Sequence, residues 1–201
     1  MNRFIRYAAL SLSTGLCCWL AFAGEPTSGF DPLQQDRSIA AWFAAGNKQA
    51  LSKNLTQLQQ QMNQGQQQAN SDRRYFLMLS YYRLGLLDHQ HGKSHFEQCL
   101  AESQQLIAQS PAYVEAYILS AACANSLIGY DRERTMELSL AGRTALQEAG
   151  RLAPSNPRLS YLQGVTAIYT PPQFGGGLAK ASELLKNAIK TFEATQKTAQ
   201  A

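Results

Sequence analysis

Apolar residues recur at helical spacing along almost the whole chain after residue 30, and strand-type alternation is absent. One such stripe joins Tyr75, Leu79, Tyr82 and Leu86, which lie three or four residues apart. A helix places residues at this spacing on a single face, where they can be buried together. Because glycine and proline divide the pattern into pieces of ordinary helix length, the sequence predicts an all-α chain of about eight helices packed as antiparallel pairs.

Caps and breaks predict where these helices begin and end. Asp31 followed by Pro32 is typical of an N-cap with proline in the first turn, and Gly46 ends the helix that follows. Ser94 and Glu97 have the spacing of a capping box, which predicts a helix start at Ser94. The expected helices cover about 31–45, 48–62, 71–91, 94–109, 110–128, 135–152, 159–168 and 178–192.

Two of the predicted helices share a pattern of small, bulky and small residues. Small residues let two helices approach closely, the bulky residue fills the space between them, and a proline ends the unit. Ala121 and Gly164 stand ten residues after Pro111 and Pro154, where the first helix of each unit needs a small residue. The members of the pattern are Gly142, Leu146 and Ala149, then Ala181, Leu185 and Ala188, whereas Cys99, Ser103 and Leu106 one unit earlier match it poorly.

This pattern is that of the second helix of a tetratricopeptide (TPR) repeat, and it makes 111–154 and 154–193 the clearest repeat units. The sequence therefore predicts that the helical pairs stack as a short TPR-like α-solenoid. We expect this domain to cover residues 31–195, with a flexible leader at 24–30 and a tail at 196–201.

The N-terminus has the three parts of a secretory signal peptide. Arg3 and Arg6 precede an apolar run over 8–20, and Ala21-Phe22-Ala23 has the small-x-small form that signal peptidase needs. We expect cleavage between Ala23 and Gly24, and a periplasmic or secreted protein. The alternative is an uncleaved membrane anchor, but the run is short for a span. No stable membrane span is expected once residues 1–23 are removed.

Composition and charge argue against several functional classes. The 201 residues carry a net charge of +4, which falls to +2 when Arg3 and Arg6 leave with the signal peptide. This charge is too mild to indicate nucleic-acid binding. No Gly-x-Ser-x-Gly motif or ordered Ser/His/Asp set is found, so we expect neither an enzyme nor a cofactor.

Three histidines lie close together in the sequence, at positions 89, 91 and 95. His91 and His95 are four residues apart, a spacing at which two helical histidines can share a metal. Gly92 lies between them and makes a continuous helix doubtful. We therefore interpret this segment as a solvated loop between helices and expect no metal site.

Two cysteines remain after signal cleavage, Cys99 and Cys123. Pro111 lies 12 residues from each, so a helical hairpin that turns there would place the two thiols at equal height on facing helices. A disulfide is one reading, since the compartment is oxidising. The alternative is a pair of buried free cysteines, because packed helix axes usually lie too far apart for a bridge.

The segment 111–193 resembles exported bacterial TPR-like proteins. The resemblance rests on three motifs: Asn156-Pro157, Tyr169-Thr170-Pro171 and Phe174-Gly175-Gly176-Gly177. It is also distantly similar to periplasmic TPR-like partners of TRAP-type solute transporters. The resemblance implies an α-solenoid and an exported location, and it implies no enzymatic activity.

We therefore expect a non-enzymatic periplasmic scaffold that binds a protein or peptide partner in the cell envelope on its concave face. The alternative is a small-solute-binding accessory of a transporter, with a pocket under the glycine loop. Hypothetical binding residues are Tyr161, Tyr169, Phe174, Gly175, Gly176 and Gly177. A purely structural role for the loop predicts at least one glycine with positive φ, and a Phe174 ring that fills the gap between the last two helices.

Overall fold

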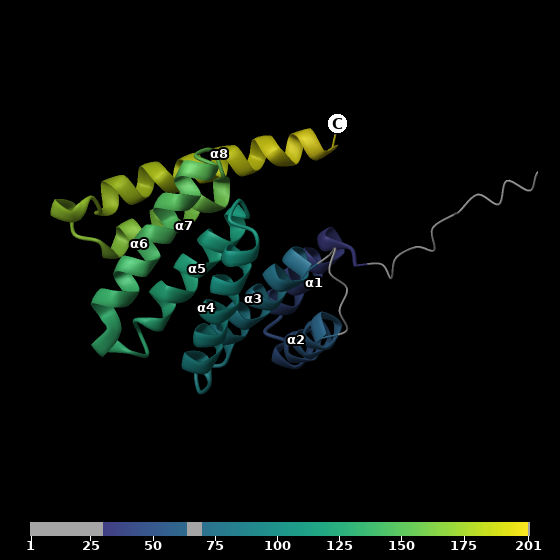
Figure 1. The fold of residues 1–201 in the computed structure, drawn as a ribbon. Coiled ribbons are helices and arrows are strands. Elements are labelled where there is room, and N and C mark those ends of the chain that lie inside the picture. Colours follow the sequence, from purple (N-terminus) through teal and green to yellow (C-terminus); the bar gives the residue numbers. More distant parts are fainter. Residues whose placement is uncertain (1–29, 64–69, 201) are drawn as a thin grey trace, which may run out of the picture.

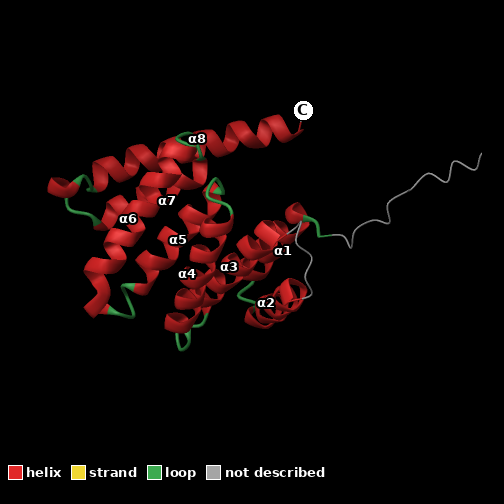
Figure 2. Ribbon diagram, in the orientation of Figure 1, coloured by secondary structure: helices red, strands yellow, loops and turns green. Residues whose placement is uncertain are grey.

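The computed structural model describes residues 30–63 and 70–200, and within them the chain is entirely helical apart from its turns (Figure 1, Figure 2). The predicted all-α fold of eight helices is confirmed for these residues. The predicted signal peptide lies outside them. The helices are α1 (Pro32–Ala44), α2 (Lys48–Asn63), α3 (Asn70–Leu87), α4 (Gly92–Gln109), α5 (Val114–Leu127), α6 (Thr135–Leu152), α7 (Pro157–Tyr169) and α8 (Leu178–Gln200), with short 3-10 helices at Arg132–Arg134 and Pro172–Phe174.

The helices form four consecutive pairs that stack as a curved solenoid (Figure 1). The first helices of the pairs touch one another in series, α1 to α3, α3 to α5 and α5 to α7. No two second helices (α2, α4, α6 and α8) touch within the described residues. The first helices are therefore the inner layer of the curve and the second helices the outer layer. Below they are called the inner and outer helices.

Each outer helix also packs on the inner helix of the next pair, and the contact repeats in register. The amide nitrogen of Asn54 in α2 lies 3.0 Å from the hydroxyl of Ser80 in α3. One pair later, the Ser103 hydroxyl in α4 lies 3.0 Å from that of Ser120 in α5. These equivalent polar contacts show that the pairs are true structural repeats, although the sequence hardly repeats there.

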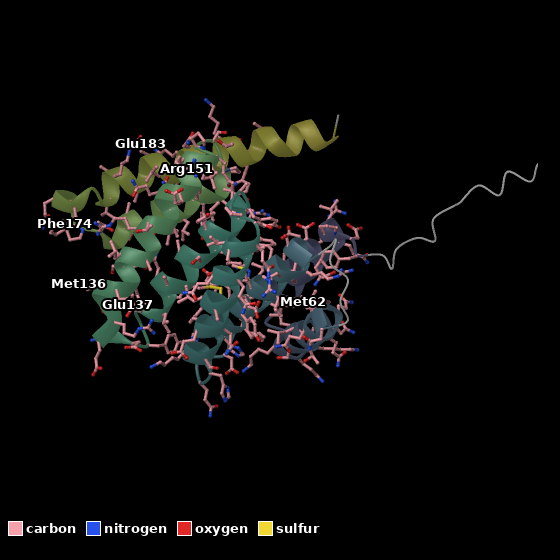
Figure 3. All side chains as sticks on the ribbon, viewed as in Figure 1. Met62, Met136, Glu137, Arg151, Phe174 and Glu183 are labelled. Carbon is pink, nitrogen blue, oxygen red and sulfur yellow. A yellow bond between two sulfur atoms is a disulfide. The ribbon has the colours of Figure 1, made fainter. Side chains whose placement is uncertain are left out.

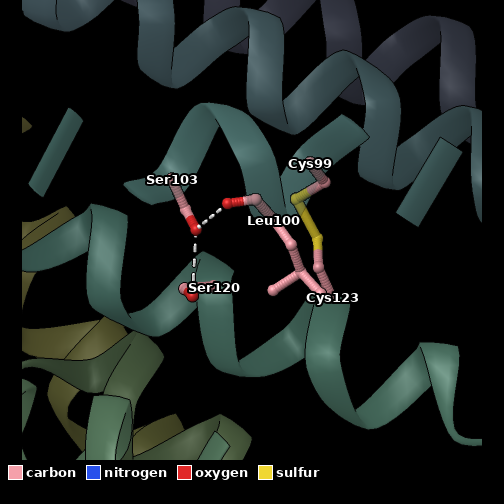
Figure 4. The surroundings of a disulfide bond; sticks show 5 residues. All are labelled: Cys99, Leu100, Ser103, Ser120 and Cys123. Atoms are coloured by element: carbon pink, nitrogen blue, oxygen red, sulfur yellow. Dashed lines mark hydrogen bonds between the residues drawn. A yellow bond between two sulfur atoms is a disulfide. The ribbon is translucent and has the colours of Figure 1, made fainter. Parts of the chain in front are cut away.

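A disulfide joins Cys99 of α4 to Cys123 of α5, beside the Ser103–Ser120 contact (Figure 4). The two Cα atoms are 6.3 Å apart and the residues are 24 apart in sequence. Of the two readings of these cysteines, the structure has the bridge. Small residues around it, such as Ala122 and Ala124, let the helices approach to that distance.

The small-bulky-small pattern has the packing role that was predicted. A Cβ added at Gly164 in α7 would lie only 2.7 Å from Cγ of Leu185 in α8. A Cβ at Gly142 in α6 would lie 2.8 Å from the Asn125 side-chain oxygen in α5. The earlier unit fits better than its sequence indicates, since Cys99, Ser103 and Leu106 are all fully buried.

The predicted start of the first helix is confirmed by its cap. The Asp31 carboxylate accepts hydrogen bonds from the backbone N–H of Leu33 and Gln34, at 2.9 and 3.2 Å. Asn156 caps α7 in the same way, so this helix begins at Pro157, two residues before the predicted start. Proline is favoured there because the first N–H of a helix has no partner within it.

Four further predicted boundaries are wrong. Helix α3 ends at Leu87, four residues before the predicted end. The capping box at Ser94 does not form, because α4 already begins at Gly92 without a side-chain cap. The helix expected at Ser110 starts only at Val114, after a turn. The last helix runs past Phe192 to Gln200. None of the helices in the described part of the chain combines the length and the apolar character needed to cross a membrane.

Candidate functional site

The loop before α8 contains the three glycines singled out by the sequence, and each has a structural reason. Gly175 and Gly177 adopt φ values of 86° and 98°, which confirms the predicted positive φ. A Cβ at Gly176 would lie 2.0 Å from the carbonyl oxygen of Thr170, so no other residue fits there without a shift of the backbone. The Gly177 N–H donates to the carbonyl of Ala167 at 2.8 Å and closes the loop onto α7.

Phe174 does not fill the gap between the last two helices, which corrects the sequence-based expectation. Its side chain is 73% exposed and stands at the tip of the α7–α8 hairpin (Figure 3). The close contact of Gly164 with Leu185 already fills the space between these helices. A Cβ at Gly175 would meet no atom within 4 Å, so the loop is open to solvent beside Phe174. An exposed ring of this kind does not roof a closed pocket.

The two tyrosines predicted to line a site near Phe174 lie apart from each other. Tyr169 ends α7 and is 83% exposed. Tyr161 lies eight residues earlier, a distance of about 12 Å along a helix. Burial raises the pKa of Tyr82 in α3, the charge of Arg83 opposes this, and Tyr161 adds a smaller contribution that raises it. Tyr161 therefore belongs to the inner layer of the solenoid and Tyr169 to the hairpin tip.

The inner layer contains a cluster that sequence analysis did not find. Asp36, Tyr75, Glu115 and Arg158 lie on α1, α3, α5 and α7 at separations of 39, 40 and 43 residues, so they occupy equivalent positions of the four pairs. The Arg158 guanidinium lies 3.7 Å from the Asp36 carboxylate and 3.5 Å from that of Glu115. Arg158 thus joins the first and last inner helices electrostatically. The signal in the sequence that could have identified this cluster is the regular spacing of three charged residues and one tyrosine near the starts of the inner helices.

Burial dominates the protonation of this cluster. It raises the pKa of Tyr75 to about 12, with the charge of Arg158 acting in the opposite direction. Burial also raises the pKa of Tyr113, whose hydroxyl donates to the Asp72 carboxylate at 2.8 Å. Burial alone would lower the pKa of Arg158, but Tyr75, Glu115 and Asp36 raise it overall. These shifts move the tyrosines and Arg158 further from neutral pH, so the three do not serve as proton-transfer groups there.

The side chains one turn after the Asp36–Arg158 cluster differ in exposure along the inner layer. Ile39 of α1 and Met78 of α3 are fully buried, and Ile118 of α5 is 6% exposed. Tyr161, at the same position of α7, is 54% exposed. This position is therefore buried in the first three pairs and open to solvent in the fourth.

An open groove lies instead on the outer side, between α4 and α6, with α5 as its floor. Its volume is about 450 Å³. Leu140 on its wall is 61% exposed, and Met136 nearby on α6 is 86% exposed (Figure 3). We call it the outer groove, and it is lined by Ile107, Tyr117, Ser120, Glu137, Leu140, Ala141, Thr144, Ala145 and Glu148.

Four of the polar residues that line the outer groove already have partners. The Tyr117 hydroxyl donates to the carbonyl of Pro111 at 3.0 Å, and Ser120 is held by Ser103. Glu137 and Glu148 pair with arginines three residues away on the same side of α6. What the groove offers a ligand is therefore mainly apolar surface. Sequence analysis missed it because Leu140 and Ala141 lie beside the small-bulky-small stripe of α6.

The expected solvated loop is found only for His89 and His91, which lie at the turn between α3 and α4, whereas His95 lies in the first turn of α4. His91 pairs with Asp88 at 2.9 Å, and His95 lies against the ring of Tyr81. Burial lowers the pKa of His95. In the part of the chain that the structure describes, no three His, Cys, Asp or Glu side chains are placed to hold a metal ion.

Comparison with known proteins yields no relative. No family model matches the chain, and neither a curated protein nor a solved structure matches it.

Proposed function

We propose that the protein is a non-enzymatic, exported TPR-like scaffold that binds a protein or peptide partner of the cell envelope in the outer groove. One observation carries this proposal: a large leucine, Leu140, is held out to solvent at 61% exposure beside an apolar hollow of about 450 Å³. Exposed apolar surface that is gathered around a hollow is typical of an interaction site.

The shape of the groove favours a chain segment over a small solute. The walls of the outer groove belong to α4 and α6, which do not touch each other, so the groove is open to solvent between them. The polar atoms of its floor are already hydrogen-bonded within the protein. Apolar side chains of a partner can therefore cover the floor without leaving these atoms unpaired. A short helix or extended peptide with apolar anchors fits these conditions.

The disulfide supports the proposed location in the cell envelope. A buried disulfide between Cys99 and Cys123 is typical of proteins that fold in an oxidising compartment, and the predicted signal peptide would deliver the chain to one. Cytosolic proteins seldom keep such a bridge.

Site-specific photo-crosslinking in living cells tests the proposal. A photoreactive phenylalanine analogue replaces Leu140 or Thr144 in the groove, or Ile168 on α7 as a control, because Ile168 is an exposed aliphatic residue at 42% that does not line the groove. We expect a discrete adduct at positions 140 and 144 and none at 168, with the partner identified by mass spectrometry. The adduct at 144 should disappear when Leu140→Asp is added. Equal adducts at all three positions, or none in the groove, would contradict the proposal.

A further inference from the structure

The outer helix α8 leaves one long side uncovered. Within the described residues α8 contacts only α7, and it runs along one edge of the molecule (Figure 1). Leu178, Ile189 and Phe192 lie along this side and are 76%, 58% and 38% exposed. Together with Leu185 they follow the helical period, so they form one apolar stripe, which we call the α8 flank.

The equivalent side of the preceding outer helices shows what covers such a flank. Ile189 directly follows the small-bulky-small pattern of α8, as Gly150 follows that of α6. A Cβ at Gly150 would lie 3.8 Å from a methyl group of Leu159, in the inner helix of the next pair. One pair earlier, Ser103 contacts Ser120 of the next inner helix. The α8 flank is therefore equivalent to the surfaces of α4 and α6 on which the next inner helix packs.

Helix α1 has the matching side. It is the first inner helix, and within the described residues its backbone packs only on α2 and α3, while Asp36 reaches Arg158 of α7. Asp36 is equivalent to Arg158 of α7, so the next residue, Arg37, corresponds to Leu159. Asp36 is also equivalent to Glu115 of α5, so Ala44, eight residues later, corresponds to Cys123. Arg37, Ala41 and Ala44 are all exposed. The two alanines permit the close approach that Ser120 and Cys123 permit in α5.

Charge complementarity points to the same contact. If α1 sat on the α8 flank as α7 sits on α6, Arg37 would lie over Ile189. Side chains lean toward the N-terminus of their helix, which would carry the Arg37 guanidinium toward Glu193, one turn further along α8. Neither Arg37 nor Glu193 forms an ion pair with a described residue. The two opposite charges thus have no ion-pair partner among the described residues and would meet between chains.

We propose that copies of this chain associate head to tail, with α1 of one copy docked on the α8 flank of the next. The contact continues the internal stacking of the solenoid. It joins two different surfaces and is therefore heterologous, and we propose that it continues from copy to copy as an open series and does not close into a ring. This contact is independent of the outer groove.

Cysteine crosslinking tests the geometry in the exported protein, whose own cysteines are bridged. Arg37→Cys and Ile189→Cys are made in separate chains and mixed under mild oxidation. We expect a covalent dimer from the mixture and at most a trace from either variant alone. Met136→Cys, at a site 86% exposed, serves as the control and should not couple to Arg37→Cys. Equally strong coupling of Ile189→Cys to itself would overturn the head-to-tail arrangement.

Sedimentation over a concentration series tests the association itself. The weight-average mass should rise past that of a dimer without a plateau, and Ile189→Glu should weaken association at least about tenfold, a loss on the order of that for an apolar contact in an interface. Arg37→Glu should also weaken it, and mixing Arg37→Glu chains with Glu193→Arg chains should restore part of it. A monomer at every concentration, a plateau at the dimer, or no effect of Ile189→Glu would overturn the proposal. Thermal melts confirm that each variant is folded.

Discussion

The close approach of α7 and α8 at Gly164 predicts different outcomes for two identical substitutions. Gly164→Ala and Gly150→Ala each replace a helical glycine by alanine, a change that usually stabilises a helix by about 1 kcal/mol. Their surroundings differ. The new Cβ at 164 would lie 2.7 Å from the Leu185 side chain and 3.3 Å from its backbone nitrogen. The new Cβ at 150 would meet only a Leu159 methyl, at an ordinary 3.8 Å.

The expected difference follows from these distances. At 150 we expect the propensity gain alone, roughly 0.5–1 kcal/mol of added stability, since this residue lies in the last turn of α6. At 164 overpacking costs about 1–3 kcal/mol and outweighs the gain. The two variants should therefore differ by about 2 kcal/mol in the free energy of unfolding. For a domain of this size that corresponds to roughly 6 °C in Tm.

Urea denaturation followed by far-ultraviolet circular dichroism measures the difference. A Leu185→Ala background supplies the control, because it removes the side chain that the new methyl group would meet. In that background Gly164→Ala should become stabilising, as Gly150→Ala is in the native chain. Equal shifts for the two glycine variants in the native background would refute the argument that α7 and α8 need a small residue at 164.

Four further outcomes are expected. Replacing both bridged cysteines by serine should lower stability by roughly 3 kcal/mol, since the bridge closes a loop of 24 residues, and alkylation of the native protein should find no free thiol. Gly176→Ala should lower the free energy of unfolding by about 3 kcal/mol, because its Cβ would meet the backbone. Gly175→Ala should lower it by about 1 kcal/mol, because its Cβ meets no atom but its φ is positive. Equal losses for the two variants would contradict this interpretation of the loop. Between pH 10 and about 12 the unfolded chain loses a proton that folded Tyr75 keeps, so stability should fall as pH rises, and Tyr75→Phe should make the fall shallower. Bulky residues in place of the alanines at 21 and 23 should leave an uncleaved precursor, and a native N-terminus that still begins at Met1 would refute export by cleavage.

Local signals in the sequence predicted most of the helices. Asp31 and Asn156 carry their own capping oxygens, and the glycines and prolines mark breaks that need no knowledge of distant residues. Ser94 misled the prediction because α4 starts two residues before it and needs no side-chain cap. The small-bulky-small pattern located the contact of Gly164 with Leu185 correctly, since such spacing constrains two neighbouring helices directly.

The surfaces were harder to predict, because they depend on how far the solenoid curves. Nothing near Phe174 in the sequence tells whether its ring points into the hairpin or away from it, and in the structure the ring is 73% exposed. The ion pair that joins the first and last inner helices links Asp36 to Arg158, which are more than 100 residues apart. The outer groove needs the separation of α4 from α6, which only the packing of whole pairs determines.

The bridge between α4 and α5 also affects how the molecule opens. Each pair of a solenoid is held only by its neighbours, so local unfolding starts most easily at the ends. Cys99 and Cys123 belong to different pairs, and their bond links the second pair covalently to the third. The terminal pairs can then exchange their amide hydrogens while the middle of the chain stays protected. Because α5 forms the floor of the outer groove, that floor lies in the most persistent part of the fold and remains shaped while the ends fray.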